Sequence, residues 1–291
     1  MAEQSLLKKT KELLSKNRLQ PKKRLGQNFL IDRHIIHKIV DAAQLGEEDL
    51  VVEIGAGLGT MTGLLAKRAG QVLAIEIDGD LLPILEKNLE GLSNVRILQQ
   101  DILQLDLDRL VAAIYPSRGQ RRYQVIGNLP YYITTPIIMR LLEEKYSIEH
   151  LVIMIQKEVG QRIKAGPGSK DYGALSVAVQ YYAVPEIICR VPASAFLPAP
   201  LVESVVLNLK IREQPAVLVE DEKLFFAVVR AAFGQRRKTL LNALAGCFQD
   251  ISKKELACRL VEAGINGQRR GEELDLQEFS RVAGALSGLK H

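Results

Sequence analysis

The chain has 291 residues, of which 47% are hydrophobic and 25% charged, with a formal net charge of +5. This composition and length suit one large globular domain with a smaller one, and no apolar stretch approaches the roughly 20 residues that would span a bilayer. The start of the chain lacks the apolar core of a signal peptide, and three widely spaced cysteines argue against a disulfide framework and fit a cytoplasmic location: Cys189, Cys247 and Cys258.

The positive charge is concentrated at the N-terminus. Residues 1–24 hold eight Lys and Arg against two Glu, so this segment carries +6 and the rest of the chain −1. A basic arm on a near-neutral body is typical of proteins that bind a polyanion such as RNA. A partly frayed, solubilising terminus is the alternative. Lys22, Lys23 and Arg24 end the arm and are candidate RNA contacts.

Helix and strand patterns alternate from Asp32 onward. Asp32 is a suitable N-cap for a helix over 32–45. Beyond it, the pattern predicts strands over 50–55, 71–77, 95–100, 123–127 and 150–156, and helices over 58–69, 79–92 and 134–146. This order predicts a doubly wound, mainly parallel α/β sheet. Two later strands, over 185–192 and 203–211, are expected to form a hairpin-like edge.

Only helical patterns follow Pro215. They predict helices over 222–234, 238–248, 253–264 and 276–286. We therefore expect an α/β domain over 25–211 and a smaller, all-helical domain over 212–291. A second basic group stands before one of these helices and gives further candidate RNA contacts: Arg236, Arg237 and Lys238.

The turn after the first predicted strand reads EIGAGLGT and opens the next helix. Gly55, Gly57 and Gly59 allow a sharp turn and a close approach of the backbone to a ligand. The pyridine-dinucleotide pattern G-x-G-x-x-G needs a glycine where Thr60 stands. The spacing therefore favours a nucleoside ligand without a pyrophosphate.

Acidic residues end the next two strands. Glu76 ends the second strand, where its carboxylate can accept hydrogen bonds from both ribose hydroxyls. Asp101 ends the third strand, where it can reach an adenine amino group. Because these strand ends share one crevice, the pattern predicts an adenosine ligand without phosphates, such as S-adenosylmethionine. His34 and His37 have no other His or Cys grouped with them, so no metal site is expected.

The fourth strand ends in the motif Asn128-Leu129-Pro130-Tyr131. The carboxamide oxygen of Asn128 can accept one hydrogen of an exocyclic amine, and a backbone carbonyl, that of Leu129, can accept the other. These two acceptors turn the nitrogen lone pair toward a methyl donor. Pro130 stiffens the turn, and Tyr131 offers a face on which an extruded base can stack. A turn with a packed tyrosine is the alternative.

With the glycine loop, this motif resembles those of adenine-N6 methyltransferases. Further segments extend the resemblance over nearly the whole chain from Lys22: KKRLGQNFL, QKEVGQRI, YGALSVAVQYY, SAFLPAPLVESVV and FGQRRKTLLNAL. The chain is similar to the ribosomal RNA adenine dimethylase family, in its bacterial small-subunit form. The resemblance implies a Rossmann-like methyltransferase domain and a helical C-terminal domain that recognises RNA. It also implies transfer of four methyl groups from S-adenosyl-L-methionine to N6 of two adjacent adenosines in the 3′-terminal hairpin loop of 16S rRNA, in the 30S particle.

The resemblance also implies roles for individual residues. Asn28 and Leu30 would cover the cofactor, whose product is S-adenosyl-L-homocysteine, and its site would be lined by Gly55, Gly57, Glu76, Asp101 and Asn128. Tyr131 and Phe196 would be the aromatic faces around the target base. We expect a cytoplasmic monomer that needs no metal. Two alternatives stay open: a 23S rRNA dimethyltransferase of the macrolide-resistance type, and a ribosome-assembly factor in which methylation is secondary.

Overall fold

The computed structural model describes residues 5–119, 121–235 and 237–288. The chain forms two compact units: Met1–Gly160 with Glu186–Ile211, and Gln161–Pro185 with Arg212–His291. The chain leaves the first unit after residue 160, returns at 186 and leaves again after 211. The second unit therefore contains residues 161–185 in addition to the C-terminal part of the chain.

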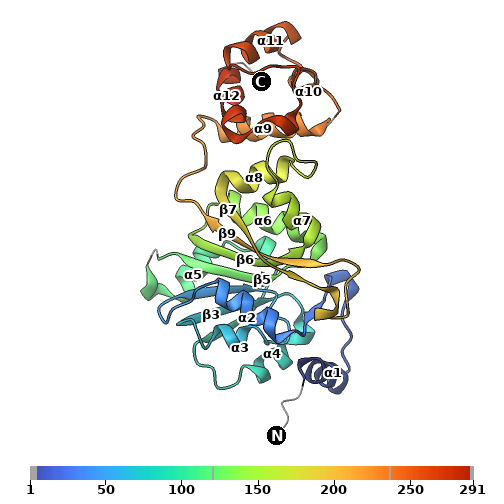
Figure 1. Ribbon diagram of the computed structural model, residues 1–291. Coiled ribbons are helices and arrows are strands. Elements are labelled where there is room, and N and C mark those ends of the chain that lie inside the picture. Colours follow the sequence, from blue (N-terminus) through green and yellow to red (C-terminus); the bar gives the residue numbers. More distant parts are fainter. Residues whose placement is uncertain (1–4, 120, 236, 289–291) are drawn as a thin grey trace. The chain divides into compact units, whose positions relative to one another are not determined.

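A seven-stranded sheet has the strand order β4-β3-β2-β5-β6-β9-β7 (Figure 1). The five strands from β4 to β6 are parallel neighbours, and β9 runs antiparallel to β6. This order confirms the predicted doubly wound sheet, with the two late strands adjacent at its edge. The bounds are β2 Leu50–Ile54, β3 Gln71–Glu76, β4 Val95–Gln99, β5 Tyr123–Asn128, β6 Ile148–Gln156, β7 Ala183–Val191 and β9 Ser204–Ile211.

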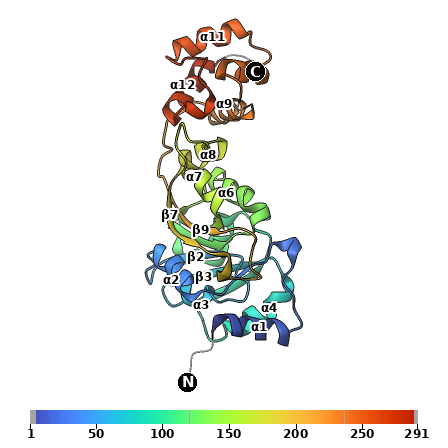
Figure 2. The same cartoon turned by 45° about the vertical axis from the view of Figure 1, so that its right-hand side comes forward.

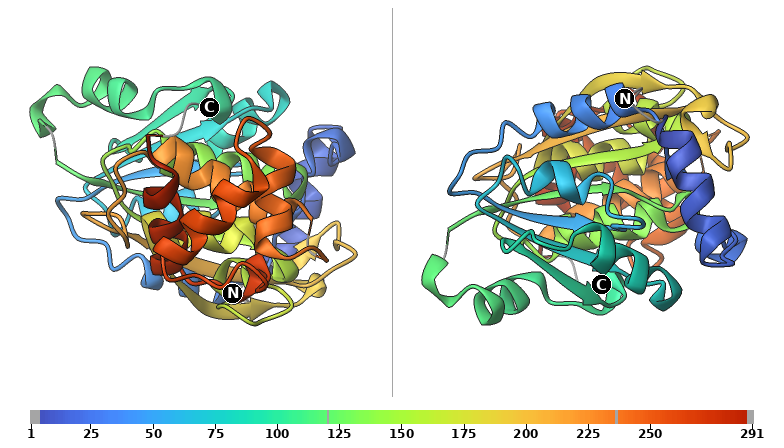
Figure 3. Two further views of the ribbon diagram at one scale, coloured as in Figure 1. Left: turned by 90° about the horizontal axis from the view of Figure 1, so that it is seen from above. Right: turned by 90° about the horizontal axis from the view of Figure 1, so that it is seen from below.

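Helices cover both faces of this sheet, as Figure 3 shows for α2 and α5. One face carries α2 (Arg33–Ala42), α3 (Thr62–Leu65) and α4 (Leu82–Asn88), and the other carries α5 (Leu107–Ile114) and α6 (Thr134–Glu143). Burial on both faces explains why the central strands are nearly continuous apolar runs. The helix α5 was not predicted, whereas Asp32 caps α2 as expected by accepting the Ile35 amide at 3.1 Å.

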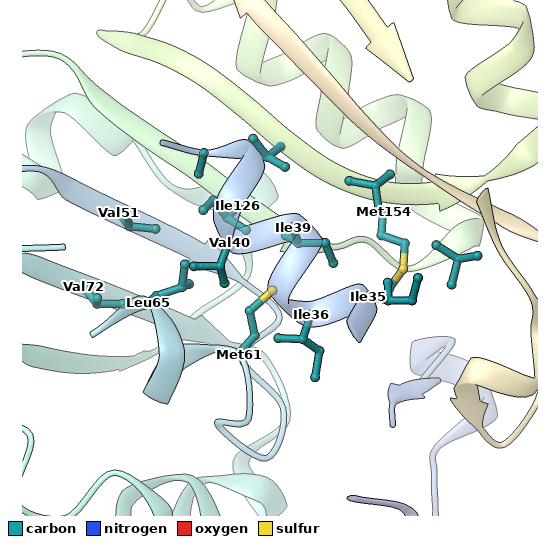
Figure 4. Close-up of a cluster of buried hydrophobic side chains, with 14 of the residues drawn as sticks. Ile35, Ile36, Ile39, Val40, Val51, Met61, Leu65, Val72, Ile126 and Met154 are labelled. Carbon is teal, nitrogen blue, oxygen red and sulfur yellow. The ribbon is translucent and has the colours of Figure 1, made fainter. Parts of the chain in front are cut away.

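The core under α2 is built mainly from aliphatic side chains (Figure 4). The helix has apolar residues at helical spacing, so its buried face points at the sheet. The members from α2 and α3 are Ile35, Ile36, Ile39, Val40 and Leu65, and those from the strands include Val51, Val72, Ile126 and Met154. This core holds the strand ends that carry the candidate site.

The N-terminal segment contains a helix where the sequence suggested a basic arm. Helix α1 spans Leu6–Lys16, begins at the cap Ser5 and lies beside α4 (Figure 2). Its Leu14 packs with Leu58, Leu81 and Ile84. Further along the chain, β1 (Phe29–Leu30) pairs antiparallel with β8 (Phe196–Leu197) in a second, two-stranded sheet.

The second unit is helical. The four predicted C-terminal helices are present, and two helices precede them in the chain, the first of which, α7, begins in the first unit and ends in the second. The bounds are α7 Lys157–Lys164, α8 Ala174–Tyr182, α9 Glu222–Gly234, α10 Leu240–Cys247, α11 Lys253–Glu262 and α12 Leu276–Leu286. Tyr181 of α8 packs against Phe225 and Phe226 of α9, with ring centroids 5.0 and 5.2 Å apart. Within the described residues, every helix is too short or too polar to cross a membrane.

Candidate active site

A pocket of the first unit opens at the carboxyl ends of β2, β3 and β5. Its walls include the glycine loop after β2, Glu76 at the end of β3 and the Asn128–Tyr131 motif after β5. The pocket offers about 930 Å³ of space, counting its mouth to solvent. This position is the usual ligand crevice of an open α/β sheet.

The glycine loop brings backbone amides to Glu76. Gly55 and Gly57 have φ angles of +77° and +58°, which are strained for any residue with a side chain. The Gly57 amide donates to Oε2 of Glu76 at 2.8 Å, and the Asp78 amide donates to Oε1 at 2.8 Å. The carboxylate is therefore held in one orientation, with its remaining acceptor capacity toward the pocket that it lines.

Glu76 is 5% exposed. Burial raises the pKa of its carboxyl group, while hydrogen bonds from the Asp78 and Gly57 amides partly oppose this shift. A buried carboxylate that accepts from hydroxyl groups suits a ribose, and the glycine loop leaves room for close approach of a ligand. The residues present thus fit the adenosine part of S-adenosylmethionine.

Glu53 is a second buried carboxylate in the pocket wall, and no role for it was predicted from the sequence. It is 1% exposed, and within the described residues its Oε2 has no hydrogen-bond partner. Burial raises the pKa of Glu53 to about 8, and the nearby charge of Glu76 adds to the shift. Its signal in the sequence is its place as the single acidic residue of the EIGAGLGT motif.

Asn128 lies at the end of β5 and reaches the segment that covers the pocket. Its Nδ2 donates to the backbone carbonyl of Asn28 at 2.8 Å. Because the amide nitrogen is held in this way, Oδ1 is the end of the side chain that can accept from an amine. The geometry suits the role predicted for Asn128, a carbonyl acceptor aimed at an adenine amino group.

The rest of the motif is held by neighbouring elements. The Leu129 amide donates to the carbonyl of Met154 in β6 at 3.1 Å, and Oγ1 of Thr134 donates to the Pro130 carbonyl at 2.9 Å. The hydroxyl of Tyr131 is 2.5 Å from Oγ of Ser204 in β9. Ser204, which was not predicted as a site residue, therefore positions the ring of Tyr131 at the pocket wall.

Two predicted site residues lie elsewhere. Asp101 follows β4 as predicted, but its Oδ1 accepts from the Leu103 amide at 2.9 Å, and it does not line the pocket. Phe196, in β8, is 3% exposed and belongs to the core under α2, also away from the pocket wall. Contact of Phe196 with a base would require the ribbon formed by β1 and β8 to shift, so its role stays a prediction.

The predicted RNA contacts differ among themselves. Lys23 and Arg24 are exposed, whereas Lys22 is partly buried and bound to two carboxylates. Arg237 and Lys238 are exposed just before α10, and Arg236 lies outside the described residues. Throughout the described ranges, no group of three or more His, Cys, Asp and Glu side chains is arranged to hold a metal ion.

Comparison with known proteins identifies the family. A sequence model of the family described as ribosomal RNA adenine dimethylase matches residues 18–283. The chain belongs to this family. Curated relatives are named "Ribosomal RNA small subunit methyltransferase A". The one from Alkaliphilus oremlandii is 50% identical over 280 residues and the one from Moorella thermoacetica 51% over 281, each covering 96% of both chains.

Solved structures support the same fold. A dimethyladenosine transferase from Plasmodium falciparum superposes with a TM-score of 0.73 at 24% identity. The superposition covers 86% of the present chain and 94% of the Plasmodium chain. The 23S rRNA methyltransferase ErmE superposes with a TM-score of 0.68 at 25% identity, covering 89% and 99%. The family and the fold make this dimethylase an S-adenosylmethionine-dependent rRNA methyltransferase.

Proposed function

We propose that this dimethylase transfers methyl groups from S-adenosyl-L-methionine to N6 of two adjacent adenosines in the 3′-terminal hairpin loop of 16S rRNA, within the 30S particle. Relatives of about 50% identity carry small-subunit names, whereas the 23S rRNA methyltransferase ErmE is 25% identical. The observation that supports this chemistry is the hydrogen bond from Nδ2 of Asn128 to the backbone carbonyl of Asn28. It leaves the carbonyl oxygen of Asn128, beside Tyr131, as an acceptor at the pocket mouth.

The chain's own residues would hold the cofactor as follows. Glu76 accepts from the ribose hydroxyls, Gly55 and Gly57 allow the backbone to approach, and Asn28 and Leu30 cover the ligand. Asp101 is assigned to the adenine edge, which requires its second oxygen to turn toward the pocket. When bound, S-adenosylmethionine supplies a methyl group on a sulfonium.

The target base would be held by the Asn128–Tyr131 motif. Asn128 Oδ1 and the Leu129 carbonyl each accept one hydrogen of the N6 amine, which pulls its lone pair out of conjugation with the ring. The Pro130 carbonyl already accepts from Thr134, which leaves Leu129 as the second acceptor. Tyr131 stacks on the base. Positioning and oriented dipoles provide the catalysis, and the proton leaves to water after the methyl is added.

The test is methyl transfer to purified ribosomal particles. The full-length protein is incubated with methyl-labelled S-adenosylmethionine and with either 30S or 50S particles from a strain that lacks these modifications. We expect label only in 16S rRNA, and at least about 100-fold slower labelling with the Asn128→Ala variant. Label in 23S rRNA would instead support the macrolide-resistance type of activity. Binding of the particle without any label would support an assembly factor.

A further inference from the structure

Lys22 belongs to the basic triplet predicted to contact RNA, yet its side chain is already bound to protein carboxylates. Its Nζ is 2.5 Å from Oδ1 of Asp78 and 2.5 Å from Oδ2 of Asp80. The Asp78 side chain is 4% exposed and that of Lys22 27%. A lysine that recruits RNA by releasing counterions needs an exposed charge, which Lys23 and Arg24 have and Lys22 does not.

Gln27 forms hydrogen bonds with both Lys22 and Asp78. Its Nε2 donates to Oδ2 of Asp78 at 2.6 Å, and its Oε1 accepts from the backbone amide of Lys22 at 2.7 Å. Both carboxylate oxygens of Asp78 therefore hold the segment 22–27. Burial alone would raise the pKa of Asp78, but the hydrogen bonds from Lys22 and Gln27 outweigh it and keep this pKa below its ordinary value. The carboxylate is thus ionised and paired.

The fastened segment forms one wall of the cofactor pocket. Six consecutive residues, 25–30, line it. The far end of the segment is held by the pairing of β1 with β8 and by the bond from the Ile31 amide to the Ala195 carbonyl at 2.8 Å. Its middle is held by the Asn128 side chain through Asn28. The near end of the segment, between α1 and Asn28, is held to Asp78 by the polar contacts of Lys22 and Gln27.

The attachment point also orients the ribose acceptor. The backbone amide of Asp78 donates to Oε1 of Glu76 at 2.8 Å. Loss of the Lys22 contact would therefore loosen both the near end of the cover and the loop that orients Glu76.

We propose that Lys22 is a positioning residue of the cofactor site: its ion pair with Asp78 and Asp80 fastens the segment 22–30 over the bound cofactor and slows cofactor release. The proposal rests on S-adenosylmethionine as the ligand of this pocket. Lys22 does not itself line the pocket, so it acts through Asp78 and Gln27. Within the triplet, RNA attraction is then left to Lys23 and Arg24.

The experiment measures cofactor dissociation in the full-length protein. Labelled S-adenosylmethionine is bound, then chased with excess unlabelled cofactor, for wild type, Lys22→Met, Lys22→Arg and the adjacent control Lys23→Met. We expect dissociation to be faster by about tenfold or more in Lys22→Met, restored in large part by Lys22→Arg, and unchanged in Lys23→Met. In parallel, the salt dependence of 30S binding should flatten for Lys23→Met only.

Equal dissociation rates in wild type and Lys22→Met would overturn the proposal, and a flattened salt dependence of 30S binding in the same variant would then make Lys22 an RNA contact. Asp80→Asn guards against a folding defect, because Asp80 is 60% exposed and its loss removes only the outer half of the ion pair. We expect it to speed dissociation by a smaller factor, and an unchanged rate would also count against the proposal. Failure of wild type to bind S-adenosylmethionine would instead contradict the proposed function.

Discussion

The side-chain amide of Asn128 donates to the backbone carbonyl of Asn28, 2.8 Å away and 100 positions earlier in the chain. Asn28 lies in the segment that lines the pocket, and Asn128 ends β5. One hydrogen bond therefore links the proposed cofactor cover to the proposed base site. When the cover is in place, this hydrogen bond holds the side chain so that the carbonyl oxygen of Asn128 points toward the pocket mouth. Closure of the cofactor site and orientation of the acceptor are therefore coupled.

Asn128→Ala should lower methyl transfer by at least about 100-fold, because a preorganised group at the reacting amine is removed. S-adenosylmethionine affinity should fall far less, since Asn128 touches the cover by a single bond. Turnover with 30S particles and calorimetric cofactor affinity are the two measurements. Near-normal turnover in the folded variant would remove Asn128 from the chemistry.

Glu76→Ala should weaken S-adenosylmethionine binding by about 10- to 100-fold, because charge-assisted hydrogen bonds of roughly 1.5–3 kcal/mol are lost. Glu86→Ala is a matched control, since Glu86 is exposed on α4. Calorimetry checks both variants. If their affinities agree with each other and with wild type, the ribose assignment of Glu76 is wrong.

Tyr131 and Phe196 need different substitutions because they are held differently. Tyr131→Ala should lose a stacking surface worth about 1–3 kcal/mol, seen in RNA turnover and not in cofactor affinity. Tyr131→Phe keeps the ring and loses only the contact with Ser204, so its effect should be smaller.

Phe196→Ala would open a cavity in the core at a cost of about 3–5 kcal/mol, which hides any effect on stacking. Phe196→Leu keeps most of the volume and removes the aromatic face. We expect it to keep its melting temperature within a few degrees of wild type and to lose RNA turnover. Normal turnover in this variant would mean that Phe196 is a core residue only.

Glu53 predicts a pH dependence of stability. Its pKa is about 8 in the folded protein against an ordinary value of 4.5, so the folded state favours the protonated form. Its contribution to the free energy of unfolding is fully present below about pH 4.5. As the pH rises toward 8 this contribution is lost, by at most about 1.4 kcal/mol per pH unit. Glu53→Gln stays neutral, so its melting temperature should exceed that of wild type by a margin that grows from pH 5 to 8. Parallel curves would show that Glu53 is not buried as a neutral acid.

The sheet and the centre of the site were predictable because they depend on local patterns. Strand runs such as 50–55 and 71–77 are apolar over their whole length, and Glu76 and Asn128 mark the strand ends where ligands bind. These signals depend only on residues that are neighbours in the sequence, so they can be recognised without a structure.

The features that were missed depend on distant contacts. Helix α1 looked like a charged arm, since its few apolar residues find partners only in the folded chain, as Leu14 does on Ile84. Strands β1 and β8 are two residues long and show no period. Lys22 reads as one of three similar cations, and only the fold brings Asp78 to it.

The basic group before α10 is expected to make binding to 30S particles depend on salt concentration. Neutralising Arg236, Arg237 and Lys238 together should weaken binding to 30S particles and flatten its salt dependence, because fewer counterions are released. Cofactor affinity should stay unchanged, since these residues belong to the second unit. Equal affinities and parallel log–log slopes for wild type and variant would show that this group makes no contact with RNA.

The central claim is the identity of the modified nucleotides. Unmethylated 30S particles are treated with the protein and S-adenosylmethionine, and the 16S rRNA is digested and mapped by mass spectrometry. The account predicts two adjacent N6,N6-dimethyladenosines in the 3′-terminal hairpin loop and no other new methyl group. Methyl groups at another site, or adenosines that stop at a single methyl with cofactor in excess, would contradict it.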